Sequence, residues 1–215
     1  MKKESTLSLV EKIYQKLRLD IYSSKIHQGA MLTEREIADF FNVSRTPVRE
    51  ALRKLEQEGL ITIIPKKGSI VKQITLQDIL EMDQIRELLE PYVAKIAAQT
   101  IDVDLLIPLE KQLIDLKSKT PSQQNCLELL ELDGQLHNAI MQFNSNSRIN
   151  SILNNLRKSF NLIRLKGATS RYQDSINEQL EIIGALKERN GKAAEKAMFK
   201  HIEKAKKNRF KIIQP

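Results

Sequence analysis

The chain has 215 residues, a mass of 24.7 kDa and a formal net charge of +8. This length predicts one large domain or two modest ones, and a composition of 41% hydrophobic and 29% charged residues argues against wholesale disorder. No stretch approaches the roughly 18 apolar residues of a membrane helix, and the single cysteine, Cys126, excludes an internal disulfide, so we expect a cytoplasmic protein with no membrane partner.

The first third of the chain predicts three helices. Apolar residues at steps of three and four predict a helix over residues 7–25. Thr33, followed three positions later by Glu36, forms a capping box that begins a second helix. Ser44 is the expected N-cap of a third helix, which Gly59 ends.

A β-hairpin and a second, all-α region follow. The β-rich runs 60–64 and 69–73 flank a turn, which predicts a hairpin. We therefore expect a mainly α protein, with a winged helix-turn-helix domain over residues 1–74 and an antiparallel six- to seven-helix bundle over 75–215. The helices expected in the bundle span 76–99, 104–118, 122–143, 146–166, 172–189 and 192–210.

The charge is distributed unevenly between these regions. Residues 1–75 carry 14 Lys and Arg against 9 Asp and Glu, a net +5, and residues 76–186 carry 11 against 15, a net −4. Residues 187–215 carry 10 against 3, a net +7. Clustered basic residues are typical of proteins that bind nucleic acid, so the distribution points to the ends of the chain.

The third helix predicts a basic face suited to DNA. Its apolar residues recur on one side, which leaves Arg45, Arg49 and Arg53 together on the other. In a helix-turn-helix, the start of the second helix meets base edges, and arginine can bind guanine or phosphate. The alternative is a solvated arginine face on a structural helix. The other candidates for DNA contact lie at helix starts and at the hairpin tip: Arg35, Ser44, Thr46, Lys66, Lys67 and Gly68.

Residues 32–38 and 43–52 closely resemble the GntR family of bacterial transcription regulators, and the resemblance extends over residues 8–73. It implies that the chain binds operator DNA through a winged helix-turn-helix. The positions that match the DNA-contacting residues of the family are Arg35, Arg45, Thr46, Arg49 and Gly68. Lys66 and Lys67 are candidates because of their charge alone and not because of the resemblance.

A pair of polar residues in the helical region has the spacing of metal ligands. Asp133 and His137 are four residues apart and share a helix face, so they can offer one oxygen and one nitrogen to a divalent metal. The same spacing is common in surface pairs. His201 lies among apolar residues of the last helix, which predicts an inward orientation.

Residues 132–137 and 197–202 resemble elements of the FCD-type effector domain found in the FadR branch of the GntR family. The resemblance implies a Zn or Ni site with three ligands: Asp133, His137 and His201. Many members have a further histidine where this chain has Gln179, whose amide oxygen is a poorer ligand. Two alternatives therefore remain: a metal completed by Gln179 or water, or an organic effector without metal.

Arg86 and Gln179 are candidates for binding the effector. The run 85–90 also resembles the FadR branch, and a buried arginine would suit a carboxylate. The alternative is an exposed charge paired with Glu90.

Together, the patterns and resemblances predict a ligand-responsive transcription regulator, with repression the more usual outcome. Two copies would pair through the helical domains and bind a near-palindromic operator, and a small carboxylate would act through a hinge over residues 73–78. One alternative is a DNA-binding dimer whose bundle is purely structural. The other is a metal-dependent enzyme, but the chain contains no phosphate-binding loop or nucleophile motif, so we expect no enzyme.

Overall fold

The computed structural model describes residues 8–160 and 169–213 of the chain. The contacts between residues divide it into two compact units, and the main boundary lies between Thr75 and Leu76. Each unit has a hydrophobic core of its own. Within the described residues, no helix combines the length and apolar character needed to cross a membrane.

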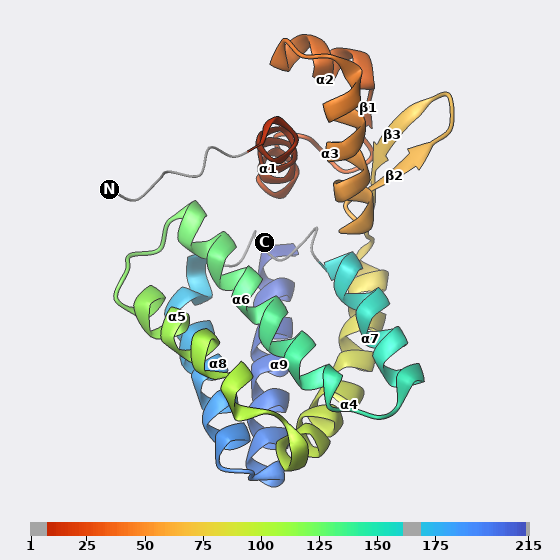
Figure 1. Ribbon diagram of the computed structural model, residues 1–215. Helices are drawn as coiled ribbons and strands as arrows, with labels where there is room; N and C mark the ends of the chain where they lie inside the picture. The colour runs from red at the N-terminus through yellow and green to blue at the C-terminus, as the bar shows by residue number, and fades with distance from the viewer. Residues whose placement is uncertain (1–7, 161–168, 214–215) are drawn as a thin grey trace. The chain divides into compact units, whose positions relative to one another are not determined.

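Three helices form most of the first unit (Figure 1). The Thr33 hydroxyl accepts the Glu36 amide at 3.2 Å and starts the second helix as the capping box predicts. Asn42 ends that helix in the left-handed conformation. The first helix ends at Tyr22, three residues before the predicted end, because Ser24 has φ 58° and cannot continue it. The helices are α1 (Leu9–Tyr22), α2 (Glu34–Phe41) and α3 (Arg45–Gln57).

A small antiparallel sheet of order β1-β3-β2 completes the first unit. The predicted hairpin is present, as β2 (Ile61–Ile64) and β3 (Gly68–Val71). The sequence pattern missed β1 (Met31–Leu32), because two residues are too few for a periodic signal. Only the pairing of β1 with β3, Met31 opposite Ile70, defines it as a strand.

The second unit is helical, as the sequence predicts (Figure 1). Its elements are α4 (Leu76–Thr100), η1 (Val103–Leu105), α5 (Ile107–Lys117), α6 (Gln123–Gln142), α7 (Ser147–Phe160), η3 (Thr169–Arg171), α8 (Tyr172–Lys187) and α9 (Gly191–Ile213). The helix predicted over 104–118 divides in two, because Pro108 lies in the first turn of α5 and lacks the N–H that a longer helix would need. The predicted residues 161–166 lie outside the described part of the chain.

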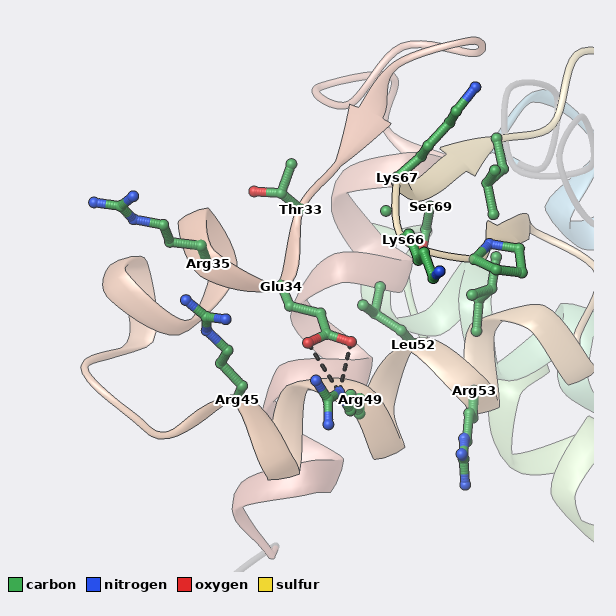
Figure 2. Close-up of a pocket in the computed structure, with 14 residues that line it drawn as sticks. Thr33, Glu34, Arg35, Arg45, Arg49, Leu52, Arg53, Lys66, Lys67 and Ser69 are labelled. Atoms are coloured by element: carbon green, nitrogen blue, oxygen red, sulfur yellow. Dashed lines mark hydrogen bonds and ion pairs between the residues drawn. The ribbon is translucent and has the colours of Figure 1, made fainter.

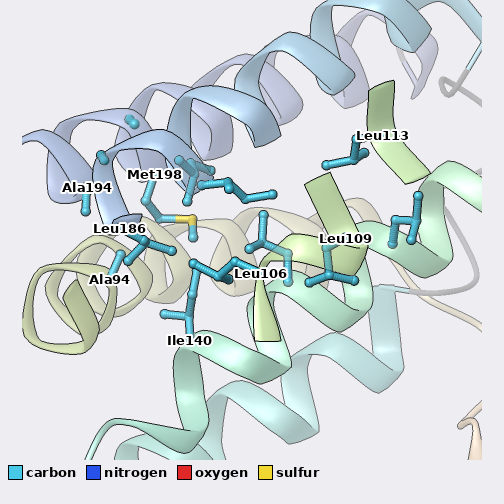
Figure 3. Close-up of a cluster of buried hydrophobic side chains, with 14 of the residues drawn as sticks. Ala94, Leu106, Leu109, Leu113, Ile140, Leu186, Ala194 and Met198 are labelled. Carbon is cyan, nitrogen blue, oxygen red and sulfur yellow. The ribbon is translucent and has the colours of Figure 1, made fainter. Parts of the chain in front are cut away.

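A single cluster of apolar side chains from helices α4 to α9, and from Ile101 and Leu106 on either side of η1, forms the core of the bundle (Figure 3). Leu106, Leu113 and Leu186 are fully buried within it. Along one side, α4 and α9 are joined by ion pairs, Lys95 with Glu195 at 2.9 Å and Lys206 with Glu87 at 2.8 Å. The same bundle also encloses a group of buried charged residues, which forms the second candidate site below.

Candidate DNA-binding groove and buried histidine site

A groove of about 690 Å³ lies between the starts of α2 and α3 and the β2–β3 hairpin (Figure 2). The side of α3 opposite the groove is apolar and packs into the core, with Val48 and Leu55 fully buried. The lining includes most of the predicted DNA-contacting residues, together with Arg53 of the predicted basic face. Its basic residues are Arg35, Arg45, Arg49, Arg53, Lys66 and Lys67.

The predicted polar residues at the start of α3 are exposed. Ser44 holds the N-cap position, but its hydroxyl makes no capping hydrogen bond to the helix. Thr46 is also exposed in the first turn. Neither residue lines the groove, yet both lie where the unpaired amides of a helix start can bind an anion.

Gly68 has a backbone role in the hairpin. Its φ is +119°, a conformation that favours glycine. A Cβ at this position would lie 2.8 Å from the Leu32 carbonyl oxygen of β1, which is too close. The side chain of Lys66, in the turn before it, is exposed, and the residue has φ 63°.

In the second unit, His137 and His201 converge on Asp133 from α6 and α9. His137 Nε2 lies 3.5 Å and His201 Nε2 lies 3.2 Å from Asp133 Oδ1. The two imidazole centroids are 5.7 Å apart, and all three residues are buried. The predicted inward orientation of His201 is thus present.

Each histidine also binds a glutamate through its other ring nitrogen. His137 Nδ1 lies 2.5 Å from Glu90 Oε2, and His201 Nδ1 lies 3.0 Å from Glu178 Oε2. Sequence reasoning missed Glu178 altogether and considered Glu90 only as a partner of Arg86. Both carboxylates are 3% exposed, so burial makes these contacts strong.

Arg86 is buried, as a role in effector binding requires, so the alternative of an exposed charge is wrong, although that alternative named the right partner. Its Nε lies 2.5 Å from Glu90 Oε1. Burial by itself raises the pKa of Glu90, but the charge of Arg86 and the contacts with Arg86 and His137 outweigh this effect and hold the pKa well below its usual range. Glu90 therefore stays ionised and joins the arginine to the histidine.

The donor set fits a divalent metal. Ligand atoms of Asp133, His137 and His201 all lie within 4.8 Å of one another. His137 Nε2 is buried and has no hydrogen-bond partner among the described residues. Gln179 is fully buried, and its Oε1 likewise lacks a partner in the described chain, although its Nε2 donates to Ser175 Oγ at 3.2 Å.

The electrostatics of the site also favour positive charge between the three ligands. Burial by itself disfavours the imidazolium form of His201, but hydrogen bonds to Asp133 and Glu178 outweigh burial and raise its pKa. A cation shared by these carboxylates is thus stabilised, whether it is a proton or a metal ion.

A winged helix-turn-helix followed by a helical bundle is the architecture of a class of transcription regulators, and sequence comparison identifies the family. Residues 9–71 match the bacterial regulatory proteins of the gntR family, and residues 79–204 match the FCD domain. The chain therefore belongs to the GntR family and carries an FCD domain.

Two of the relatives are named as repressors. The chain is 32% identical over 206 residues to the HTH-type transcriptional repressor RspR of Escherichia coli, covering 95% of this chain and 90% of the relative. It is 30% identical over 167 residues to the gluconate operon transcriptional repressor of Bacillus subtilis, covering 76% and 68% respectively.

Solved structures share the fold. Escherichia coli McbR/YncC matches with a TM-score of 0.64 at 18% identity, covering 96% of this chain and 99% of that one. A GntR regulator from Rhodococcus sp. RHA1 matches with a TM-score of 0.65 at 21% identity, covering 94% and 97%.

Proposed function

We propose that this chain is a ligand-responsive repressor that binds operator DNA through the groove of its winged helix-turn-helix domain, residues 1–74. The single observation that carries the proposal is the concentration of arginine and lysine side chains between a helix-turn-helix and a wing. Family membership and the repressors among its relatives support the same conclusion. Residues 75–215 would form the part that senses the effector.

The proposed contacts differ in what they recognise. Arg45 and Arg49, on the exposed side of α3, would meet base edges in the major groove. Lys66 and Lys67, at the tip of the hairpin, would bind phosphate, as would Arg35 at the start of α2. Ser44 and Thr46 would donate to a phosphate beside the start of α3.

The test is binding to duplexes that the full chain selects from a randomised DNA library. We expect Arg45→Ala to weaken binding to the selected duplex by about 1–3 kcal/mol, because one base contact is lost. Lys67→Ala should weaken binding to all duplexes and reduce the dependence of log K on log salt by about 0.9. Lys111→Ala, an exposed lysine of α5, is the matched control. Unchanged binding by both groove variants would contradict the proposal.

In the sensing part, a divalent metal would be held by Asp133, His137 and His201, with Gln179 or water beside it. When bound, the metal would supply a Lewis acid that anchors a carboxylate of the effector. Glu90 and Glu178 would fix the ring orientations, so that both Nε2 atoms face the metal. Arg86, buried beside Glu90, would add a second attraction for the carboxylate.

Regulation would require two copies of the chain. A dimer formed through the helical units would present two DNA-binding units to the two halves of a near-palindromic operator. An effector would change operator affinity only to the extent that it binds one arrangement of these units better than the other. A thermal-shift screen of small carboxylates, with and without chelator, tests whether the chain binds an effector and whether the metal is needed. If no compound stabilises the protein, a purely structural bundle is favoured.

A further inference from the structure

One carboxylate lines the otherwise basic groove. Glu34 is the first residue of α2, and its two carboxylate oxygens share the Nε–H of Arg49, at N···O distances of 2.7 and 2.9 Å (Figure 2). The two residues are 15 positions apart and join the start of α2 to α3. A negative charge here opposes the phosphate attraction of the neighbouring cations, so the contact weakens general affinity for DNA.

The geometry of the contact leaves the part of Arg49 that recognises bases available. Both bonds use Nε, on the side edge of the guanidinium group. Within the part of the chain that the structure describes, the two terminal amino groups of Arg49 have no hydrogen-bond partner. Those groups are the pair of donors that fits the O6 and N7 atoms of a guanine.

Glu34 also restricts a side chain that would otherwise be mobile. The Arg49 side chain is 60% exposed and the Glu34 side chain 31%, so little packing holds the arginine. A bond to a carboxylate fixed on α2 selects one direction for the guanidinium before DNA arrives. The entropy lost on forming a base contact is then smaller.

The other groove arginines are held more loosely or not at all. Arg35 lies 3.8 Å from Asp39, and both side chains are at least 74% exposed, so this pair imposes little direction. Arg45 and Arg53 have no ion-pair partner among the described residues. Among the arginines of the groove, Arg49 is therefore the one whose side chain is held in one direction by a carboxylate.

We propose that Glu34 is a positioning residue, which directs Arg49 toward one base pair and so creates sequence preference at the cost of general DNA affinity. This inference rests on the proposed DNA-binding function. Glu34 would have two effects on DNA binding. Its negative charge lowers the affinity for any duplex, and its acceptor oxygens increase the preference for one base pair by orienting Arg49.

The experiment is selection from a DNA library randomised over about two helical turns, followed by sequencing, with wild type, Glu34→Ala, Glu34→Gln and Arg49→Ala. Glu50→Gln removes the same charge from an exposed residue of α3 that does not line the groove, and serves as the control. Affinity for a duplex of scrambled sequence is measured in parallel, and circular dichroism confirms that each variant is folded.

We expect Glu34→Ala to reduce discrimination by about fivefold or more at the base pair whose preference Arg49→Ala also removes, and to leave the other positions unchanged. Glu34→Gln, which keeps an acceptor oxygen, should retain part of that discrimination. Both Glu34 variants should bind the scrambled duplex more tightly than wild type, and more tightly than Glu50→Gln.

The proposal is overturned if Glu34→Ala keeps the full preference, or if it flattens positions other than those set by Arg49. It is also overturned if specific and scrambled binding fall equally, which would indicate a merely structural role. A wild-type chain that selects no sequence at all would instead contradict the proposed function.

Discussion

His137 and His201 each have one ring nitrogen toward Asp133 and the other toward a glutamate. A carboxylate at Nδ1 holds the proton there in the neutral ring, which leaves Nε2 as a ligand atom. Because both rings are oriented in this way, the arrangement resembles the surroundings of a metal ligand more than those of an ordinary buried ion pair.

Glu178 would therefore influence the affinity of the proposed metal site without itself being a ligand. We predict that Glu178→Gln lowers the affinity for Zn²⁺ or Ni²⁺ by about 10–100-fold, because the imidazole of His201 loses orientation and basicity. Competition with a chromophoric chelator measures this affinity. His137→Ala, which removes a proposed ligand, should show the larger loss.

Glu181→Gln is the matched control, because Glu181 lies on the same helix but is exposed and pairs with Lys200. Since Glu178 also binds Arg171 and Lys204, the melting temperature of each variant must be measured. Equal metal affinity in wild type and the folded Glu178→Gln variant would reject the role of Glu178.

The spacing of residues along the sequence predicted only part of the histidine site. Asp133 and His137 are recognisable because a helix brings residues four apart to one face. Glu90 meets His137 from another helix, and no local period connects the two. Only the packing of α4 against α6 and of α8 against α9 brings the glutamates to the histidines.

Among the elements, the wing depends on one glycine. Gly68 begins β3 with a positive φ and lies against the Leu32 carbonyl of β1. Because Gly68 has no side chain, β1 can pair with the hairpin. The glycine therefore has a structural role in addition to the DNA contact that the family resemblance implies.

We predict that Gly68→Ala destabilises the protein by about 1–3 kcal/mol, because alanine is strained at this φ and its Cβ meets the carbonyl. Urea unfolding of the full chain followed by circular dichroism measures the change. Gly184→Ala is the control: Gly184 is inside α8, and a Cβ added there would meet no atom within 4 Å, so alanine should stabilise by about 0.5–1 kcal/mol. Equal stability of wild type and Gly68→Ala would contradict the argument.

The helices were the easiest elements to predict from the sequence, because apolar residues recur within each of them at a period of 3.6 residues. The start of α2 is also explicit, since Thr33 and Glu36 form a capping box. The strand β1 was not accessible, because its hydrogen bonds depend on a partner strand almost forty positions away along the chain rather than on its own residues.

For the whole molecule, the basic C-terminal segment proves to be part of the bundle. Lys206 pairs with Glu87 and Arg209 with the fully buried Asp83, both on α4. Lys200 and Lys204 pair with glutamates of α8. Much of the +7 charge of residues 187–215 is therefore matched by the acidic middle of the chain, which leaves the first unit as the candidate for DNA.

A stripe of apolar side chains on α4 is the candidate surface for dimerisation. Leu88, Tyr92 and Ile96 are spaced four residues apart and are 75%, 47% and 36% exposed. Residues at this spacing share one face of the helix. Exposed apolar side chains that lie together are typical of surfaces that bind another protein.

We predict that Leu88→Glu converts the proposed dimer to a monomer, because a charge placed within an apolar interface is left without a partner. Light scattering coupled to size exclusion measures the mass. Ile114→Glu changes an exposed isoleucine of α5 in the same way and should leave the dimer intact. A dimeric Leu88→Glu variant would exclude this stripe as the interface, and a monomeric wild type would contradict the dimer itself.

The amino-acid sequence predicts the mainly α fold, the hairpin, the starts of α2 and α3 and the basic side of α3, because each depends on residues close together along the chain. It also carried the family resemblance that the comparisons confirm. The tertiary structure alone decided the pairing of β1, the burial of Arg86, the link between Glu34 and Arg49, and the glutamates behind the histidines. These depend on contacts between separate elements, which only the packing of the folded chain creates.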